Sequence, residues 1–262
     1  MACEDERGSV VSYLPEVAGV APGFRKGRSV LEGYQRGWGL RFTPLRNAVL
    51  ADPVYQEAAA LAAGRTILDE DHRLNLFLIL RFHLARLASG HIVEFGAYRG
   101  GNAIFMAAVV ARLHPGTKVY ALDTFAGMPP TDKAIDAHNV GDFADVDLPE
   151  LRRYVADVGL RNLELHQGPF AEVAPAVLRA AGRIRLAHID CDIYSAVAYC
   201  YDVAKPYMLD GGYLVFDDAT VASCLGATEA VEDLVIRRDG LNSEQIWPQF
   251  VFRSPPRSAV VR

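Results

Sequence analysis

Carboxylates follow two apolar stretches of this chain, at the point where each expected strand ends. The first stretch, "RIRLAHIDCDIY", contains Asp190 and Asp192, and the second, "GGYLVFDDA", contains the adjacent Asp217 and Asp218. Ligands bind beyond the carboxyl ends of the strands in a parallel sheet, so we expect these acids to converge at one edge of a binding cleft. Unpaired carboxylates at short range raise one another's pKa, and a bound cation relieves that repulsion.

The ligand chemistry of this acid group favours a hard divalent cation. Oxygen ligands suit Mg²⁺ or Ca²⁺, and the chain shows no local cysteine or histidine spacing of a zinc site. We therefore predict that Asp190, Asp217 and Asp218 bind a divalent cation. The alternative is that the acids cap the helices that follow them, and Asp192, shortly before Ser195, is the best candidate for a cap.

A glycine-rich loop, "EFGAYRGG", follows an earlier short strand. Its glycines, Gly96, Gly100 and Gly101, leave the strand and enter a helix, where the backbone can turn sharply and offer free N–H groups to a ligand. Their spacing departs from the G-x-G-x-x-G fingerprint of nicotinamide-binding proteins. Glu94, two residues before the first glycine, suits an ammonium group better than a pyrophosphate. A glycine-rich turn without a ligand is the simpler alternative.

An acid also ends the next expected strand, "KVYALD". Asp123 stands at the tip of this second strand, where a carboxylate can accept hydrogen bonds from both hydroxyls of a ribose. Its distance from Glu94 along the chain fits one strand–helix–strand unit. A helix cap or a solvated turn residue is the alternative.

The segment 124–147, "TFAGMPPTDKAIDAHNVGDFADVD", has no clear periodicity. Connections of this length without helix or strand are typically functional lids or disordered. His138 within it is a candidate general base, although a solvated loop histidine is the simpler interpretation.

The elements that position these residues alternate between strand and helix. Such alternation predicts an α/β fold, with a parallel sheet and helices on both faces. The expected helices are 69–90, 101–114, 149–158, 195–209 and 228–240. The expected strands are 91–97, 118–123, 163–168, 183–190 and 211–218, followed by an antiparallel pair formed by 244–247 and 249–254.

The composition limits the class of protein. The 262 residues are 51% hydrophobic and 23% charged, which fits one large α/β domain with additions or two small domains. A net charge of −5 gives no sign of nucleic-acid binding. The four cysteines form no C-x-x-C pair, no apolar run reaches the roughly 18 residues of a membrane helix, and the start lacks the apolar core of a signal peptide. We expect a cytoplasmic protein with no membrane or nucleic-acid partner.

These motifs resemble those of a known family. The E-x-G-x-x-x-G loop, the acid after the second strand and the closing hairpin resemble class I S-adenosylmethionine-dependent methyltransferases. More narrowly, "HIDCDIYSAV", "GGYLVFDDA" and "ALDTFAGMP" resemble the macrocin O-methyltransferase group, over about residues 70–240. The resemblance implies a Rossmann-like, mostly parallel seven-stranded sheet with an antiparallel C-terminal hairpin. It also implies a methyltransferase domain at 71–262, preceded at 1–70 by an N-terminal arm and helical extension that acts as a lid or in oligomerisation.

The resemblance also assigns roles by position. Asp190, Asp217 and Asp218 match the metal-binding acids, and Asp190 also matches the general base. The cofactor contacts fall on Glu94, Phe95 and Gly96 at the methionine end, Asp123 at the ribose, and Gly168 in "HQGPF" near the adenine. Phe95 and Tyr98 differ from the residues of relatives, which affects the fine shape of the cofactor pocket.

The implied function is Mg²⁺-dependent transfer of a methyl group from S-adenosylmethionine to a sugar hydroxyl. The acceptor would be a deoxysugar nucleotide or a glycosylated antibiotic intermediate, and the enzyme would be a homo-oligomer. A catechol- or phenol-type O-methyltransferase, a nicotinamide-dependent oxidoreductase and a catalytically silent binding module are the alternatives. The sequence leaves the general base open among Asp190, Asp192 and His138.

Overall fold

The computed structural model describes residues 45–256 and four short strands before them. Of these strands, β1 (Cys3–Glu4) pairs antiparallel with β2 (Val10–Val11), and β3 (Phe24–Arg25) pairs antiparallel with β4 (Arg28–Ser29). The predicted arm at 1–70 therefore lies largely outside the described residues.

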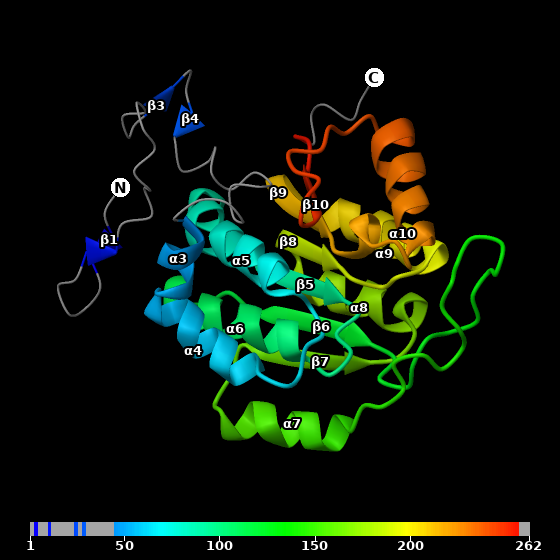
Figure 1. Ribbon diagram of the computed structural model, residues 1–262, viewed down its shortest axis with the longest axis horizontal. Helices are drawn as coiled ribbons and strands as arrows, with labels where there is room; N and C mark the ends of the chain where they lie inside the picture. The colour runs from blue at the N-terminus through cyan, green and yellow to red at the C-terminus, as the bar shows by residue number, and fades with distance from the viewer. Residues whose placement is uncertain (1–2, 5–9, 12–23, 26–27, 30–44, 257–262) are drawn as a thin grey trace.

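The core of the described chain is a six-stranded sheet with the order β10-β9-β8-β5-β6-β7 (Figure 1). Neighbouring strands from β5 to β9 run parallel, and β10 runs antiparallel to β9, as the sequence predicts. The strand order reverses between β5 and β8, which places a ligand crevice beyond their carboxyl ends. The strands are β5 (His91–Phe95), β6 (Val119–Asp123), β7 (Leu163–Gln167), β8 (Ile184–Ile189), β9 (Met208–Phe216) and β10 (Phe250–Arg253).

The expectation of a seventh strand is wrong for the described residues. Instead of a strand at 244–247, the structure has one isolated bridge between Gln245 and Val251. Pro248 lies between the two residues and has no N–H group to donate to a ladder, so the pairing does not extend.

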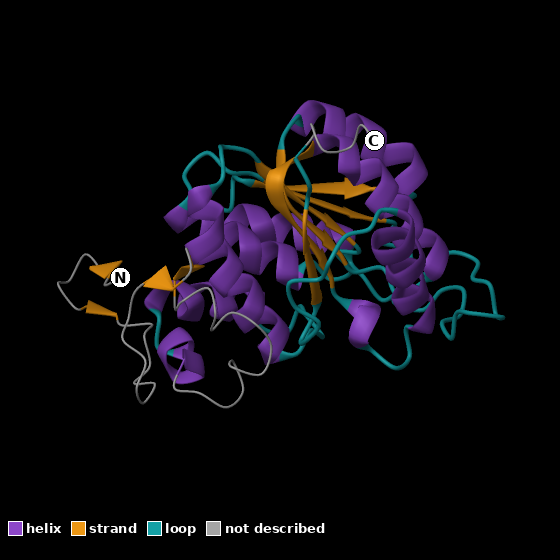
Figure 2. Cartoon of the chain, turned by 90° about the horizontal axis from the view of Figure 1, so that it is seen from above, coloured by secondary structure: helices purple, strands orange, loops and turns teal. Residues whose placement is uncertain are grey.

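Side chains alternate between two cores along each strand. On β5, Ile92 packs in one core, and its neighbours Val93 and Phe95 pack in the other. Helices cover both faces of the sheet (Figure 2). On the Ile92 face lie α3 (Leu45–Leu50), α4 (Pro53–Ala62), α5 (Glu70–Leu78), α6 (Gly101–Leu113) and α7 (Leu148–Asp157), and on the opposite face lie α8 (Phe170–Ala181), α9 (Tyr194–Ala204) and α10 (Leu225–Ala230).

Three of the described helices extend beyond their α-helical residues, and α9 does so through the 3-10 turn η3 (Lys205–Tyr207). After α5 come a π-helical turn, η1 (Ile79–His83), and a 3-10 turn, η2 (Leu84–Arg86), so the predicted helix at 69–90 is confirmed. After α10 comes the π-helical η5 (Val231–Arg238), which completes the helix predicted at 228–240.

Helix α8 was not predicted. Pro175 stands inside it, and an interior proline argues against a helix because it removes a hydrogen bond. Burial of Ala174, Val177 and Leu178 against the sheet stabilises the helix despite the proline.

The segment 124–147 contains turns but no helix or strand, as expected. It leaves the carboxyl end of β6 and forms the long loop drawn in green at the right of Figure 1. None of the helices that the structure describes is both long enough and apolar enough to span a lipid bilayer.

Candidate active site

A cavity of about 470 Å³ lies at the carboxyl ends of the central strands. Its walls come from the loops that follow β5, β6, β8 and β9, from residues 65–69 and from the segment 124–147. The position is the crevice expected from the reversal of strand order between β5 and β8.

The structure brings the three predicted metal-binding acids together in this cavity. Asp190 follows β8, and Asp217 and Asp218 follow β9, the parallel neighbour of β8. One carboxylate oxygen from each residue lies within 4.8 Å of the other two, and all three residues line the cavity. Their convergence is as predicted, and their role as metal ligands stays a prediction.

The charges of these acids are not balanced within the trio. Burial, followed by the neighbouring Asp217 and Asp218, raises the pKa of Asp190 well above its usual value. Burial, followed by Asp192 and Asp217, does the same to the pKa of Asp218. A divalent cation favours the ionised form of each carboxyl, and three oxygen ligands facing a cavity fit Mg²⁺ or Ca²⁺.

Asp217 differs from Asp190 and Asp218 in the direction of its pKa shift, because two histidines contact it. His72 Nδ1 lies 3.0 Å from both carboxylate oxygens, and the fully buried His188 places its Nε2 3.3 Å from Oδ1. Although burial opposes the change, hydrogen bonds with His188 and His72 lower the pKa of Asp217. Gln249 Nε2 also donates to Oδ1, so Asp217 is held from three sides.

His188 connects this acid to the first strand of the domain. Its Nδ1 lies 3.3 Å from Glu94 Oε1. Although burial lowers it, hydrogen bonds with Asp217 and Glu94 raise the pKa of His188 to about 9. His188 therefore links Glu94 on β5 to the Asp217 carboxylate of the acid trio.

Sequence reasoning missed His72, His188 and Gln249. His188 offered a signal, because it is a polar residue in the otherwise apolar run that ends at Asp190. His72 offered none, since it lies on α5, 145 residues away from Asp217.

The predicted cofactor residues Gly96 and Asp123 line the same cavity. Gly96 has φ +89°, and a Cβ there would lie 1.5 Å from the carbonyl oxygen of Asp190, so only glycine fits this turn. Asp123 Oδ2 accepts a hydrogen bond from Tyr98 N (2.8 Å), and Oδ1 accepts one from Phe125 N (2.7 Å). Thr124 Oγ1 also donates to Oδ1 at 3.4 Å, so Oδ2 is the oxygen that keeps a lone pair for a ribose hydroxyl.

Glu94, Phe95 and Gly168 do not line the cavity but support its walls. Glu94 is 0% exposed and accepts a hydrogen bond from Asn102 Nδ2 at 2.6 Å, while its Oε2 is buried without a hydrogen-bond partner. Phe95 packs edge-on against Phe170. Gly168 N donates to the Asp123 carbonyl at 2.9 Å. Direct contact between these three residues and a cofactor stays a prediction.

The interpretation of Asp192 as a helix cap is wrong. Helix α9 begins at Tyr194, whose N–H donates to Asp136 Oδ1 at 3.0 Å, and the Asp192 carboxylate faces His138 and Cys224 instead. Nor is His138 a solvated loop residue, because its side chain is only 16% exposed. These contacts join the segment 124–147 to the loop after β8.

Comparison with known proteins finds methyltransferases. A family model described as macrocin-O-methyltransferase (TylF) matches residues 72–239. The 8-demethyl-8-(2,3-dimethoxy-alpha-L-rhamnosyl)-tetracenomycin-C 4'-O-methyltransferase of Streptomyces olivaceus is 29% identical over 164 residues, which cover 58% of this chain and 62% of the relative. Mycinamicin III 3''-O-methyltransferase of Micromonospora griseorubida is 25% identical over 167 residues, covering 59% of this chain and 63% of the relative. The match thus spans less than two thirds of either relative.

Solved structures share the fold. The O-methyltransferase NovP aligns with a TM-score of 0.61 and 19% identity, covering 73% of this chain and 83% of NovP. The calicheamicin methyltransferase CalS11 aligns with a TM-score of 0.56 and 21% identity, covering 76% of this chain and 91% of CalS11. The class I methyltransferase fold predicted from the sequence is confirmed, with six strands instead of seven.

Proposed function

This chain belongs to the macrocin-O-methyltransferase family, and from that membership we propose that it transfers a methyl group from S-adenosylmethionine to a sugar hydroxyl. The observation that carries the proposal is one cavity lined both by the acid trio and by Gly96 and Asp123. One relative is named for 4'-O-methylation of a rhamnosyl tetracenomycin, which supports a deoxysugar nucleotide or a glycosylated antibiotic intermediate as the acceptor.

When bound, S-adenosylmethionine supplies an electrophilic methyl group, and a divalent cation lowers the free energy needed to ionise the acceptor hydroxyl. Asp190, Asp217 and Asp218 would hold the cation, with Mg²⁺ preferred over Ca²⁺. Asp190 is also the proposed general base, because its carboxylate lines the cavity that would hold the acceptor. The cavity walls would exclude water and keep acceptor and cofactor aligned.

The cofactor contacts proposed for this chain lie at the carboxyl ends of β5, β6 and β7. Asp123 would accept from the ribose hydroxyls, Gly96 and Phe95 would shape the turn at the methionine end, and Gly168 would shape the loop near the adenine. The partnerless Oε2 of Glu94 suits a positively charged group such as the cofactor ammonium.

The deciding experiment combines cofactor binding with turnover. We expect calorimetry to show binding of S-adenosylmethionine but not of a nicotinamide nucleotide, and methyl transfer to a deoxysugar nucleotide or a glycosylated antibiotic but not to catechol. Exhaustive chelation should abolish turnover, and added Mg²⁺ should restore it. Turnover of catechol alone would contradict the sugar acceptor, and full activity without divalent ions would contradict the metal.

We further propose a cytoplasmic homo-oligomer in which residues 1–70 contribute a lid or a subunit contact. Residues 65–69 already line the cavity, which supports the lid. Light scattering of the full chain and of a chain without residues 1–30 tests the oligomer, and equal masses and equal turnover would contradict a role for the arm.

A further inference from the structure

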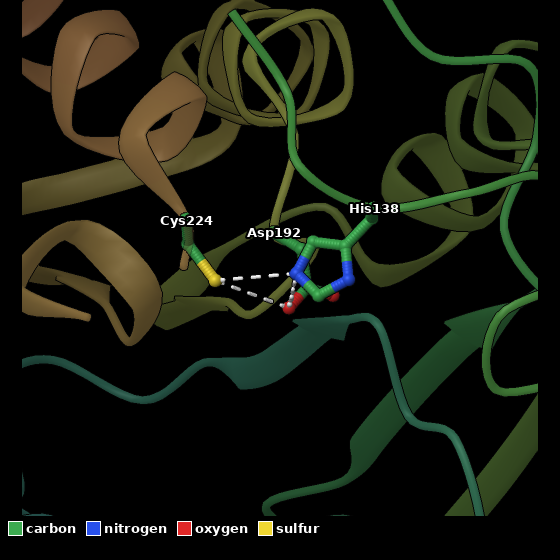
Figure 3. Close-up of side chains that lie close together, drawn as sticks. All are labelled: His138, Asp192 and Cys224. Atoms are coloured by element: carbon green, nitrogen blue, oxygen red, sulfur yellow. Dashed lines mark hydrogen bonds and ion pairs between the residues drawn. The ribbon is translucent and has the colours of Figure 1, made fainter. Parts of the chain in front are cut away.

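A second group of metal-binding side chains lies in the wall of the cavity (Figure 3). His138 comes from the segment 124–147, Asp192 from the loop after β8, and Cys224 from the residue before α10. His138 Nε2 lies 3.4 Å from Asp192 Oδ1 and 3.5 Å from Cys224 Sγ, and Sγ lies 3.5 Å from the same Oδ1. Three donor atoms from distant parts of the chain thus form a nearly equilateral triangle.

The triangle has the size of one face of a tetrahedral zinc site. Zinc binds nitrogen and oxygen at about 2.1 Å and sulfur at about 2.3 Å, so tetrahedral angles give N···O edges of about 3.4 Å and N···S and O···S edges of about 3.6 Å. The three observed distances agree with these edges to within about 0.1 Å.

The surroundings of the histidine match those of a metal ligand. His138 Nδ1, the nitrogen that faces away from the triangle, lies 3.5 Å from Asp142 Oδ2. A carboxylate on the second ring nitrogen orients a ligating histidine and increases its basicity. Asp142 is itself held, because its Oδ2 accepts a hydrogen bond from Asn139 N at 2.8 Å.

The backbone of Asp192 is held in an uncommon conformation that aims its carboxylate at the triangle. Its φ is +61°, a left-handed value that is costly for a residue other than glycine. Its N–H donates to Asp218 Oδ2 at 2.9 Å, which fixes the strained turn.

Cys224 is 3% exposed, so its thiol is shielded from bulk solvent. All three side chains of the triangle line the cavity, so a ligand in the cavity can reach an ion bound there. Three protein ligands with one open position are characteristic of zinc sites that bind water or substrate.

We propose that His138, Asp192 and Cys224 bind a zinc-type metal ion, distinct from the cation proposed on the acid trio, and that this ion fastens the segment 124–147 to the cavity wall. On binding, the Cys224 S–H bond breaks, the proton passes to solvent and the thiolate donates its electron pair to the metal. The nitrogen and sulfur ligands select zinc, whereas the oxygen-only trio selects magnesium. The proposal does not depend on methyl transfer.

The test is a Co²⁺ titration of the metal-stripped full chain in excess Mg²⁺. We expect a thiolate-to-cobalt charge-transfer band that saturates at one equivalent. Cys224→Ser should abolish the band, and Asp142→Asn should weaken Co²⁺ binding by about 10- to 100-fold, as loss of an outer partner typically does. His138→Gln, which removes a ligand from a loop, should weaken it by at least about 100-fold.

Two matched variants should keep the band. Cys191→Ala removes a different cysteine of the same cavity, and Asp217→Asn alters the acid trio. If no band forms, or if the band survives Cys224→Ser or disappears in Cys191→Ala, the triangle is a hydrogen-bonded contact only and the proposal fails. Circular dichroism confirms that each variant is folded, and His138→Gln decides the matter if Cys224→Ser does not fold.

Discussion

Aspartates gather at two places in this molecule, and the chain treats their charge in opposite ways. At the surface, Asp239 after η5 receives hydrogen bonds from Arg238, from Lys205 Nζ (2.5 Å) and from Tyr201 Oη (2.7 Å). Although burial opposes the change, the hydrogen bonds from Arg238, Lys205 and Tyr201 lower the pKa of Asp239 to about 2. Asp202 joins the same group through Arg238.

In the cavity, Asp190 and Asp218 form no ion pair with any lysine or arginine among residues 45–256, and their pKa values rise. The difference teaches how to interpret an acid cluster. Where the chain supplies the cations, the acids join two helices, here α9 and η5. Where it leaves the charge of acids that line a cavity unbalanced, we expect them to bind a cation from outside.

The largest expected effect is a loss of turnover when one acid of the cavity cluster is changed, compared with the same change in the surface cluster. Asp190→Asn should lower turnover by about 10²- to 10⁴-fold, the usual contribution of a general base, while S-adenosylmethionine affinity stays within a few fold. Asp202→Asn in the surface cluster should leave turnover unchanged. Initial rates and calorimetry on both variants measure turnover and cofactor affinity. Equal losses of turnover in the two variants would contradict a special role for the cavity acid.

Mg²⁺ should stabilise the folded protein through the cavity cluster alone. At about 100 times its dissociation constant, a ligand that binds only the native state raises the free energy of unfolding by about 2.7 kcal/mol. Thermal unfolding with and without Mg²⁺ should show this increase in the wild type and in Asp239→Asn. Asp218→Asn should show little of it, and an undiminished increase in that variant would place the ion elsewhere.

Asp123 sharpens the comparison because its oxygens accept from backbone N–H groups, not from cationic side chains. Asp123→Ala should weaken S-adenosylmethionine binding by about 1.5–3 kcal/mol, the value of a charge-assisted hydrogen bond. Calorimetry measures the loss, with the exposed Asp157→Ala on α7 as control. Unchanged affinity in Asp123→Ala would remove this residue from the cofactor site.

The smallest effect concerns stability against acid. Because the pKa of Asp239 is depressed to about 2, its stabilising contribution is present above the ordinary aspartate value of about 3.9 and is lost as the pH falls through about 2. Urea unfolding at neutral pH should find Asp239→Asn less stable by about 1 kcal/mol, a value reduced by solvent screening. This gap should close below about pH 2, and a gap that persists there would point to packing instead of charge.

Features set by neighbouring residues were predictable from the sequence. Apolar runs in the sequence predict the strands that precede or contain Asp123 and Asp190. The parallel pairing of β8 and β9 then brings Asp190 and Asp217 to adjacent strand ends. The resemblance to a known family predicted which fold contains these strands.

Features set by long-range packing were not predictable. His138 and Cys224 are 86 residues apart, so their contact leaves no local spacing to recognise. The cap of α9 comes from Asp136, 58 residues before it, which is why Asp192 was misassigned. Helix α8 was missed because tertiary burial outweighs its interior proline.

The contact between Gly96 and Asp190 has a consequence for protein engineering. Because a Cβ at position 96 would overlap the Asp190 carbonyl, the loop after β5 and the residue after β8 are packed together at the backbone. If Gly96 contacts the cofactor and Asp190 the acceptor, as proposed, substitutions near these two residues are expected to show epistasis, and a mutation near Gly96 selected for a new cofactor analogue would alter the position of Asp190 as well. Redesign of either half has to treat both strand ends as one unit.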